Sequence, residues 1–237
     1  MDTSRQDGII DPTQLRQFGV TVIGAGAVGS YAIQALTKMG VENIKVYDED
    51  GVTAHNIPNQ FYRLKDASGA AFKVEALAEI VKEFTGVNMQ YETGMYHNQE
   101  LSDIVVVATD SMSSRKLVWE QFKQQSQCKY LVEARMGGEL GRIYSIGRQK
   151  FANGMLDLGM LTLGEDDIKF YEDTLYTDDE AAQLRCSERA IIYNVLMIAA
   201  FICRSVKGFV RGETVKREMI FNFAQMEEDS LVYMGRS

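Results

Sequence analysis

The chain has 237 residues, a formal net charge of −8 and a hydrophobic fraction of 46%, which is enough apolar material for the core of one large domain. The acidic balance argues against binding to nucleic acid or to an anionic membrane, because both partners require a basic face. The three cysteines lie far apart without a C-x-x-C pair, so they favour a reducing compartment and do not support a zinc site. The first ten residues lack the apolar segment of a signal peptide, and we therefore expect a cytoplasmic protein.

The first predicted unit is a strand, a glycine-rich turn, a helix and a second strand, all within Gly19 to Asp50. A short apolar run at residues 20–23 is typical of a buried parallel strand. Apolar residues then recur at helical spacing from Ala32 to Met39, and Gly40 ends the helix. The second apolar strand ends at Asp48. This order is the one that a nucleotide-binding βαβ unit requires.

Three glycines in the turn have separate physical roles in such a unit. Gly24 permits the sharp turn out of the strand, Gly26 lets the backbone approach a phosphate, and Gly29 lets the helix pack against the strand. The free N–H groups at the start of the helix attract an anion. Asp48 follows Gly29 by 19 residues, where a carboxylate can accept hydrogen bonds from ribose. The alternative is a βαβ unit in which the glycines serve packing alone.

The remaining chain alternates between strand and helix patterns as far as residue 134. The segment 51–72 has turn residues and little periodicity, and such long irregular runs are usually functional. Apolar periodicity predicts the following elements in order: helix Lys73 to Phe84, strands Val87 to Tyr91 and Asp103 to Ala108, helix Ser114 to Gln125, strands Tyr130 to Ala134 and Arg142 to Ile146, helix Glu188 to Val206, and strand Glu218 to Phe223. Residues 151–185 are irregular and acidic, and a polar tail closes the chain.

These patterns predict the fold class. We expect a Rossmann-like, doubly wound and mainly parallel sheet with helices on both faces and an antiparallel extension, all in one domain. The nucleotide-binding half would be residues 1–134, and residues 135–237 would hold an irregular acidic crossover segment, a long helix and the final strands. The most apolar segment, Ala190 to Val206, is interrupted by polar residues, so we interpret it as a buried helix and not a membrane span.

Charged residues follow the strands that a parallel sheet would bring together at one edge. Asp48 and Asp50 follow the second strand, Lys73 opens a helix, and Asp110 follows the Asp103 to Ala108 strand. A lysine and an aspartate beside a glycine-rich turn suit a triphosphate with its Mg²⁺ better than a dinucleotide. Two plainer roles stay open, a helix N-cap for Asp110 and a solvated charge in the first helical turn for Lys73.

Several ordered motifs resemble those of one family. SRQ at residues 4–6 is similar to its N-terminal arginine motif, GAGAVGS to its phosphate loop, and DEDGVTAHNIPNQ to its D-x-D-x-V-x-x-x-N-x-x-R-Q segment. Lys73 falls at the family lysine if one inserted residue is allowed, ATDSMSSR is similar to T-D-N-x-x-x-R, and EARMGGELGRIYSI to a glycine-rich strand pair. On these motifs, which cover most of residues 4–147, the chain resembles the ubiquitin-activating enzyme superfamily, in particular the ThiF/MoeB-like adenylyltransferases.

The resemblance implies ATP-dependent adenylation of a carboxylate, typically the C-terminal glycine of a ubiquitin-like or sulfur-carrier protein, by a homodimer. Asp48 would bind the ribose, Lys73 the phosphates and Asp110 the Mg²⁺, while Arg5 would reach the triphosphate, often across the dimer. The catalytic residues would be Arg5, Lys73, Asp110 and Cys186. The whole cofactor-binding set would be Gly24, Gly26, Ala27, Gly29, Asp48, Asp50, Asn56, Asn59, Gln60, Lys73 and Asp110.

The chain departs from the family pattern at three points. Asn59 replaces the arginine of N-x-x-R-Q, which removes a cation from the phosphates, and Arg63 is a candidate substitute. Ser111 replaces the asparagine after the magnesium aspartate, and the paired C-x-x-C zinc motifs are absent. The loss of the arginine leaves open a second function, that of a catalytically weakened homologue that binds nucleotide as an adaptor.

Cys186 is the candidate for an onward acyl transfer, because many relatives carry a thioester-forming cysteine between the acidic segment and the last long helix. Arg185, Arg189 and the helix start would lower the pKa of its thiol. A structural cysteine is the alternative. Cys203 lies in an apolar helix and Cys128 precedes a strand without an activating partner.

Two further functions stay open on the sequence. The βαβ unit alone permits an NAD-dependent oxidoreductase, but no Tyr-x-x-x-Lys pair occurs, and His55 and His97 are the only histidines. Relatives also adenylate small molecules or modified tRNA bases, although the acidic composition makes tRNA a poor candidate.

Overall fold

The computed structural model describes residues 1–237 except 149, 153–154, 158–162, 178–190, 226 and 233–237. Its elements, in chain order, are η1 Ser4–Gln6, α1 Pro12–Arg16, β1 Val20–Ile23, α2 Ala27–Met39, β2 Ile44–Asp48, η2 Ala54–Asn56, α3 Leu64–Ser68, α4 Lys73–Thr85, β3 Gln90–Thr93, β4 Ile104–Val107, α5 Met112–Gln124, β5 Tyr130–Gly137, β6 Leu140–Gly147, β7 Lys150–Ala152, β8 Met155–Asp157, α6 Glu165–Glu172, α8 Ile192–Val210, β9 Lys216–Asn222 and β10 Glu227–Val232.

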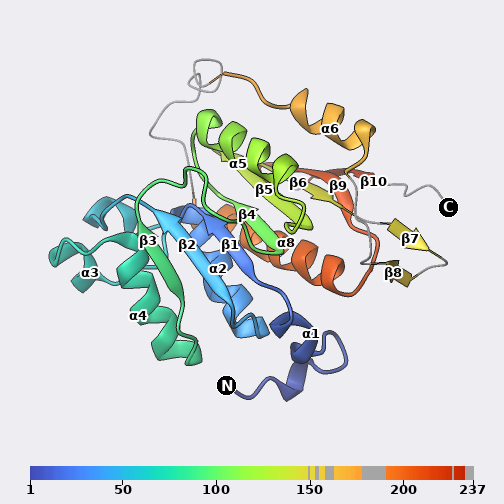
Figure 1. Cartoon of the computed structure of the whole chain (residues 1–237). Coiled ribbons are helices and arrows are strands. Elements are labelled where there is room, and N and C mark those ends of the chain that lie inside the picture. The colour runs from blue at the N-terminus through green and yellow to red at the C-terminus, as the bar shows by residue number, and fades with distance from the viewer. Residues whose placement is uncertain (149, 153–154, 158–162, 178–190, 226, 233–237) are drawn as a thin grey trace.

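One mixed sheet forms the centre of the molecule (Figure 1). Its strand order is β10-β9-β6-β5-β4-β1-β2-β3, in which β3, β2, β1, β4 and β5 are parallel. The last three strands, β6, β9 and β10, add an antiparallel extension. The two central strands β1 and β4 are buried along their whole length, as their uninterrupted apolar runs indicate. The predicted fold class is confirmed.

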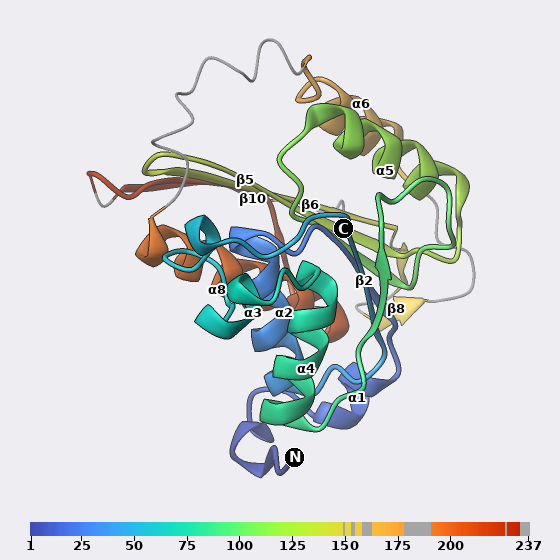
Figure 2. The same cartoon turned by 90° about the vertical axis from the view of Figure 1, so that its left-hand side faces the viewer.

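Helices cover both faces of the sheet (Figure 2). On one face α2, α4 and α8 pack their apolar sides onto residues such as Val22, Val46 and Val132. On the other face α5 and α6 pack against the opposite side chains of the same strands, with Trp119 of α5 and Tyr171 of α6 in contact at 4.5 Å between ring centroids. Because successive residues of a strand point to opposite faces, the all-apolar strands can supply both cores.

The strand order creates a topological switch point between β1 and β4. The chain leaves β1 for β2 and β3 on one side, and then crosses back to β4 on the other side. In open α/β sheets, ligands bind at the carboxyl ends of the strands at such a point. The fold therefore places the turn after β1 and the turn after β4 next to each other, at the edge where a ligand is expected.

Helix α8 is long and apolar enough to cross a membrane by length and composition, yet 56% of its apolar window is buried inside the fold. It packs against α2, β5 and β6, which agrees with the predicted buried helix. It continues to Val210, beyond the predicted end at Val206.

Two predictions for the second half of the chain are wrong. Residues 151–185 are not irregular throughout, because they contribute to the β7–β8 hairpin and contain helix α6. The acidic residues Glu165, Asp166 and Asp167 form the first turn of α6, where the helix dipole favours negative charge. The predicted polar tail contains β10, which pairs with β9 at the sheet edge.

Candidate nucleotide-binding site

The glycine-rich turn connects β1 to α2 and has the tight geometry that its sequence predicts. Gly24 has a φ of +97°, and a Cβ atom there would lie 2.7 Å from the carbonyl oxygen of Ala108. A Cβ atom at Gly29 would lie 2.0 Å from the carbonyl oxygen of Gly24. A Cβ atom at Gly26, by contrast, would meet no described atom within 4 Å. Gly24 and Gly29 are thus required by the fold itself, whereas Gly26 borders open space at the start of α2.

Two residues that the sequence analysis did not identify hold this turn. The Tyr62 hydroxyl donates to the Ala25 carbonyl at 2.5 Å, and Tyr62 is buried. The Ser30 hydroxyl accepts from the Phe61 backbone N–H at 3.0 Å. The segment between β2 and α4, residues 49–72, therefore packs against the glycine-rich turn. Ser30 lies inside the GAGAVGS motif, so the motif carried a signal for it, but nothing in the local pattern indicated Tyr62.

Asp48 lies at the end of β2 beside the turn. One carboxylate oxygen accepts from the Ala25 N–H at 2.7 Å, and the other accepts from the Asp50 N–H at 2.9 Å. Burial raises the pKa of Asp48, and the nearby Lys73 charge opposes that shift. Each carboxylate oxygen can accept a second hydrogen bond, so the predicted role toward a ribose is compatible with these contacts.

Lys73 opens α4 and is buried beside the same aspartate. Its Nζ atom lies 2.6 Å from the Asp50 carboxylate and 4.0 Å from that of Asp48. The side chain of Lys73 is 7% exposed, so the alternative of a solvated charge is wrong. Asp50 is 62% exposed, and its carboxylate forms the closer of the two ion pairs of Lys73.

Asp110 follows β4 at the same edge and is exposed. The alternative role of helix cap belongs to its neighbour, because the Ser111 hydroxyl accepts from the Ser114 N–H at 3.2 Å and Ser111 is the N-cap of α5. Among the described residues, no group of three or more His, Cys, Asp or Glu side chains is placed to hold a metal ion. Mg²⁺ at nucleotide sites commonly uses one or two carboxylates plus phosphate oxygens, and Asp110 fits that mode of binding.

The three predicted amide residues between β2 and α4 differ in their contacts. The Asn56 side chain accepts from the backbone and hydroxyl of Thr53 and caps η2. Gln60 precedes the segment that contacts the turn, and its Oε1 atom is buried without a hydrogen-bond partner among the described residues. An amide oxygen in that state is suited to bind a ligand or a water molecule. Asn59 is partly exposed, and its backbone N–H bonds to the Asn56 carbonyl at 3.2 Å.

Two predicted cations lie elsewhere. Arg63, the candidate substitute for the missing arginine, forms ion pairs with Asp66, Glu79 and Glu83, so it would have to exchange these contacts to reach a phosphate. Arg5 is exposed on η1, and its neighbour Gln6 bonds to the Lys38 carbonyl near the end of α2. Since α2 begins at the turn and rises about 1.5 Å per residue, the Lys38 carbonyl that holds the neighbour of Arg5 lies about 17 Å from the turn of the same chain.

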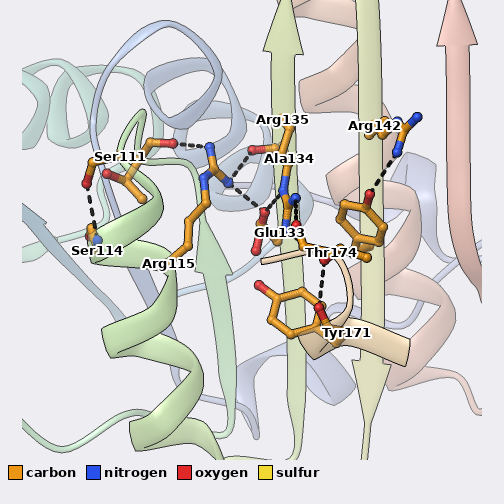
Figure 3. A network of polar contacts seen from close by, with 11 residues as sticks. Ser111, Ser114, Arg115, Glu133, Ala134, Arg135, Arg142, Tyr171 and Thr174 are labelled. Atoms are coloured by element: carbon orange, nitrogen blue, oxygen red, sulfur yellow. Dashed lines mark hydrogen bonds and ion pairs between the residues drawn. The ribbon is translucent and has the colours of Figure 1, made fainter. Parts of the chain in front are cut away.

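A second feature that sequence reasoning missed is a buried polar network between the start of α5 and β5 (Figure 3). Arg115 of α5 binds the fully buried Glu133 at 2.7 Å, and Arg135 binds the same carboxylate oxygen. Arg135 also donates to the carbonyl and hydroxyl of Thr174. Arg115 is the last residue of the ATDSMSSR motif, so the spacing of that motif was the available signal.

The described cysteines are poor nucleophiles. Cys128 and Cys203 are both buried, and burial raises the pKa of each thiol to about 12. At neutral pH neither forms the thiolate that attacks an acyl group. Cys186 lies outside the described residues, as do Arg185 and Arg189.

The model of the ThiF family matches residues 7–204. The chain belongs to the ThiF family.

Individual relatives match shorter parts of this ThiF-family chain. Adenylyltransferase and sulfurtransferase MOCS3 of Culex quinquefasciatus is 30% identical over 121 residues, which is 47% of this chain and 27% of that protein. Ubiquitin-like modifier-activating enzyme 5 of Arabidopsis thaliana is 38% identical over 77 residues, 31% of this chain and 18% of the relative. The tRNA threonylcarbamoyladenosine dehydratase of Escherichia coli is 38% identical over 64 residues, 27% of this chain and 24% of the relative. The matches thus span about a quarter or less of these proteins.

Solved structures agree with the fold. Escherichia coli MccB, crystallised with ATP, has a TM-score of 0.68 at 15% identity over 95% of this chain and 66% of that one. PaaA has a TM-score of 0.69 at 15% identity over 98% of this chain and 70% of that one.

The open space beside Gly26 provides a test of the site in this ThiF-family protein. We expect Gly26→Ala to fold with near-normal stability, because its methyl group meets no described atom within 4 Å, and to lose most nucleotide affinity, because the methyl group occupies the space for phosphate. Gly29→Ala should instead unfold at lower temperature. Thermal unfolding and ATP titration of both variants measure this. Wild-type affinity in Gly26→Ala would place the nucleotide elsewhere.

Proposed function

We propose that this ThiF-family protein is an ATP-dependent adenylyltransferase that transfers AMP to a carboxylate, most fittingly the C-terminal glycine of a ubiquitin-like or sulfur-carrier protein. The observation that carries the proposal is the meeting of the glycine turn after β1, Lys73 and Asp110 at the switch point of a ThiF-family sheet. The relatives support it, since their names include an adenylyltransferase and an activating enzyme of ubiquitin-like modifiers.

Each residue of the site has a separate role in the proposed reaction. The first-turn N–H groups of α2 bind phosphate oxygens, and Asp48 accepts from ribose hydroxyls. Lys73 exchanges its contact with Asp50 for the β- and γ-phosphates. Asp110 would hold the Mg²⁺, which neutralises charge on the leaving pyrophosphate when bound. No protein base is needed, because the attacking carboxylate is already ionised at pH 7, so the site must only place it in line with the α-phosphorus.

The proposal includes a homodimer in which Arg5 reaches the triphosphate of the partner subunit. Its support is that Arg5 is exposed and lies far from the turn of its own chain. Sedimentation at micromolar concentration tests the assembly. Mixing Arg5→Ala with Asp110→Ala subunits tests the shared site, because a mixed dimer would contain one intact site. A monomer with normal activity would contradict this part of the proposal.

A catalytically weakened, nucleotide-binding adaptor is the second candidate. It is favoured by Asn59 in place of the family arginine, together with the engagement of Arg63 by three carboxylates. The match to the ThiF family makes an NAD-dependent oxidoreductase less favoured than either of the two ATP-binding functions. The melting temperature measured with Mg²⁺·ATP and with NAD separates an ATP-binding protein from an NAD-dependent one.

The direct test of product formation is intact-mass analysis of candidate ubiquitin-like proteins, such as those encoded beside the gene, after incubation with Mg²⁺ and ATP. An added AMP on the C-terminal carboxylate is expected, and it should be lost from a carrier that lacks the terminal glycine. An adaptor would bind the carrier and leave its mass unchanged.

Onward transfer of the acyl group through Cys186 forms a separate prediction. We expect Cys186→Ala to retain pyrophosphate exchange and to lose any adduct that dithiothreitol releases, because adenylation requires no thiol and the described thiols are buried. Cys128→Ala is the matched control and should keep the adduct. If exchange is lost as well, Cys186 serves structure or the nucleotide site, and an adduct that persists would contradict the assignment.

A further inference from the structure

Arg115 binds the backbone between β4 and Asp110 and links it to the middle of β5. It lies in the first turn of α5 and is 5% exposed. Its Nη2 atom donates to the Thr109 carbonyl, while its Nη1 atom donates to the Ala134 carbonyl at 3.0 Å and to Glu133 Oε1 at 2.7 Å. One guanidinium thus connects the backbone just after β4 with the middle of β5; Figure 3 shows the contacts with Glu133 and Ala134.

The glycine turn contacts the preceding peptide group, between Ala108 and Thr109. A Cβ atom at Gly24 would lie 2.7 Å from the Ala108 carbonyl oxygen and 3.0 Å from the Thr109 nitrogen, so the glycine turn packs directly on this strand end. The Thr109 carbonyl and the Asp110 N–H belong to one planar peptide group. The guanidinium therefore fixes the orientation of the peptide group that precedes Asp110. It thereby sets the direction of the Asp110 side chain relative to the glycine turn.

Glu133 keeps the guanidinium in this place. Its side chain is fully buried and accepts from both Arg115 and Arg135. A guanidinium presents several N–H donors in a rigid fork, whereas a lysine ammonium is a single centre on a flexible stem. Lysine at position 115 can preserve the ion pair with Glu133, but it cannot also hold the carbonyls of Thr109 and Ala134 in the same geometry.

We propose that Arg115 is a positioning residue that sets Asp110 against the glycine turn, so that metal and triphosphate are bound together. This proposal rests on the proposed function in assigning Asp110 to the metal. Arg115 would set the geometry between Asp110 and the glycine turn without itself contacting nucleotide or metal.

The experiment compares Arg115→Lys with Arg148→Lys. Arg148 is an equally buried arginine whose guanidinium also binds backbone carbonyls, those of Phe122 and Lys123 in the last turn of α5 and of Cys128 beyond it. Binding of Mn²⁺ to the purified full chain is measured by calorimetry at saturating ATP, together with ATP affinity without metal and the melting temperature. The Mg²⁺ dependence of pyrophosphate exchange is a further readout.

Both variants should melt at lower temperature, but only Arg115→Lys should bind Mn²⁺ about tenfold more weakly with ATP affinity in the absence of metal nearly unchanged. Equal effects of the two substitutions on Mn²⁺ affinity would overturn the proposal and leave Arg115 a structural residue. If Arg115→Lys is too unstable to purify, Glu133→Gln replaces it with the same expectation. A wild-type protein that binds Mn²⁺·ATP but exchanges no pyrophosphate would contradict the proposed function alone, since the metal affinities still decide the role of Arg115.

Discussion

Asp110→Ala is expected to reduce Mg²⁺-dependent adenylation by at least about 100-fold while the fold stays intact. The side chain is exposed and does not cap α5, so its removal should change the free energy of unfolding by less than about 0.5 kcal/mol. Initial rates of AMP transfer and denaturant unfolding measure the two quantities.

Ser111→Ala is the matched control for Asp110→Ala. It removes the cap of α5 and should cost about 1 kcal/mol of stability, while the activity stays within a few-fold of the wild type. The neighbouring residues would thus separate catalysis from folding. Normal turnover of Asp110→Ala would show that the metal role belongs to another residue.

Lys73→Ala should weaken ATP binding by roughly 10- to 100-fold and AMP binding by less than about threefold, because the lysine charge faces the β- and γ-phosphates in the proposed complex. The substitution also leaves the buried Asp48 without its nearest cation, so some loss of stability is expected. Isothermal titration with the two nucleotides measures the difference between them.

Lys65→Ala is the control, since Lys65 is an exposed lysine of α3, in the segment that leads from β2 to α4. It should leave both affinities unchanged. Equal loss of ATP and AMP binding in Lys73→Ala would place the lysine away from the terminal phosphates.

The parts of the fold that follow from local pattern could be predicted from the sequence. The apolar runs of β1 and β4 and the helical spacing of α2, which ends at Gly40 in the left-handed conformation, are set by short-range chemistry. The wrong predictions fall where distant contacts decide. Helix α6 depends on Tyr171 packing against Trp119 of α5, and β10 exists because β9 offers it an edge.

The candidate site divides in the same way. Glycine, lysine and aspartate at the strand ends could be predicted because the carboxyl ends of parallel strands meet at one edge. The hydrogen bond from Tyr62 to Ala25 and the pairing of Arg63 with Glu79 join segments whose approach no local pattern indicates. Arg63 in particular was a cation at a suitable spacing, and only the position of α4 shows that carboxylates hold it.

The central claim is that ATP is cleaved between its α- and β-phosphates at the β1–β4 edge to activate a carboxylate. Exchange of labelled pyrophosphate into ATP measures this step directly, with and without each candidate ubiquitin-like protein. We predict exchange that requires Mg²⁺ and the carrier and that disappears in Asp110→Ala. Absence of exchange with every carrier, in a protein that binds Mg²⁺·ATP, would contradict the claim and identify the chain as a nucleotide-binding adaptor.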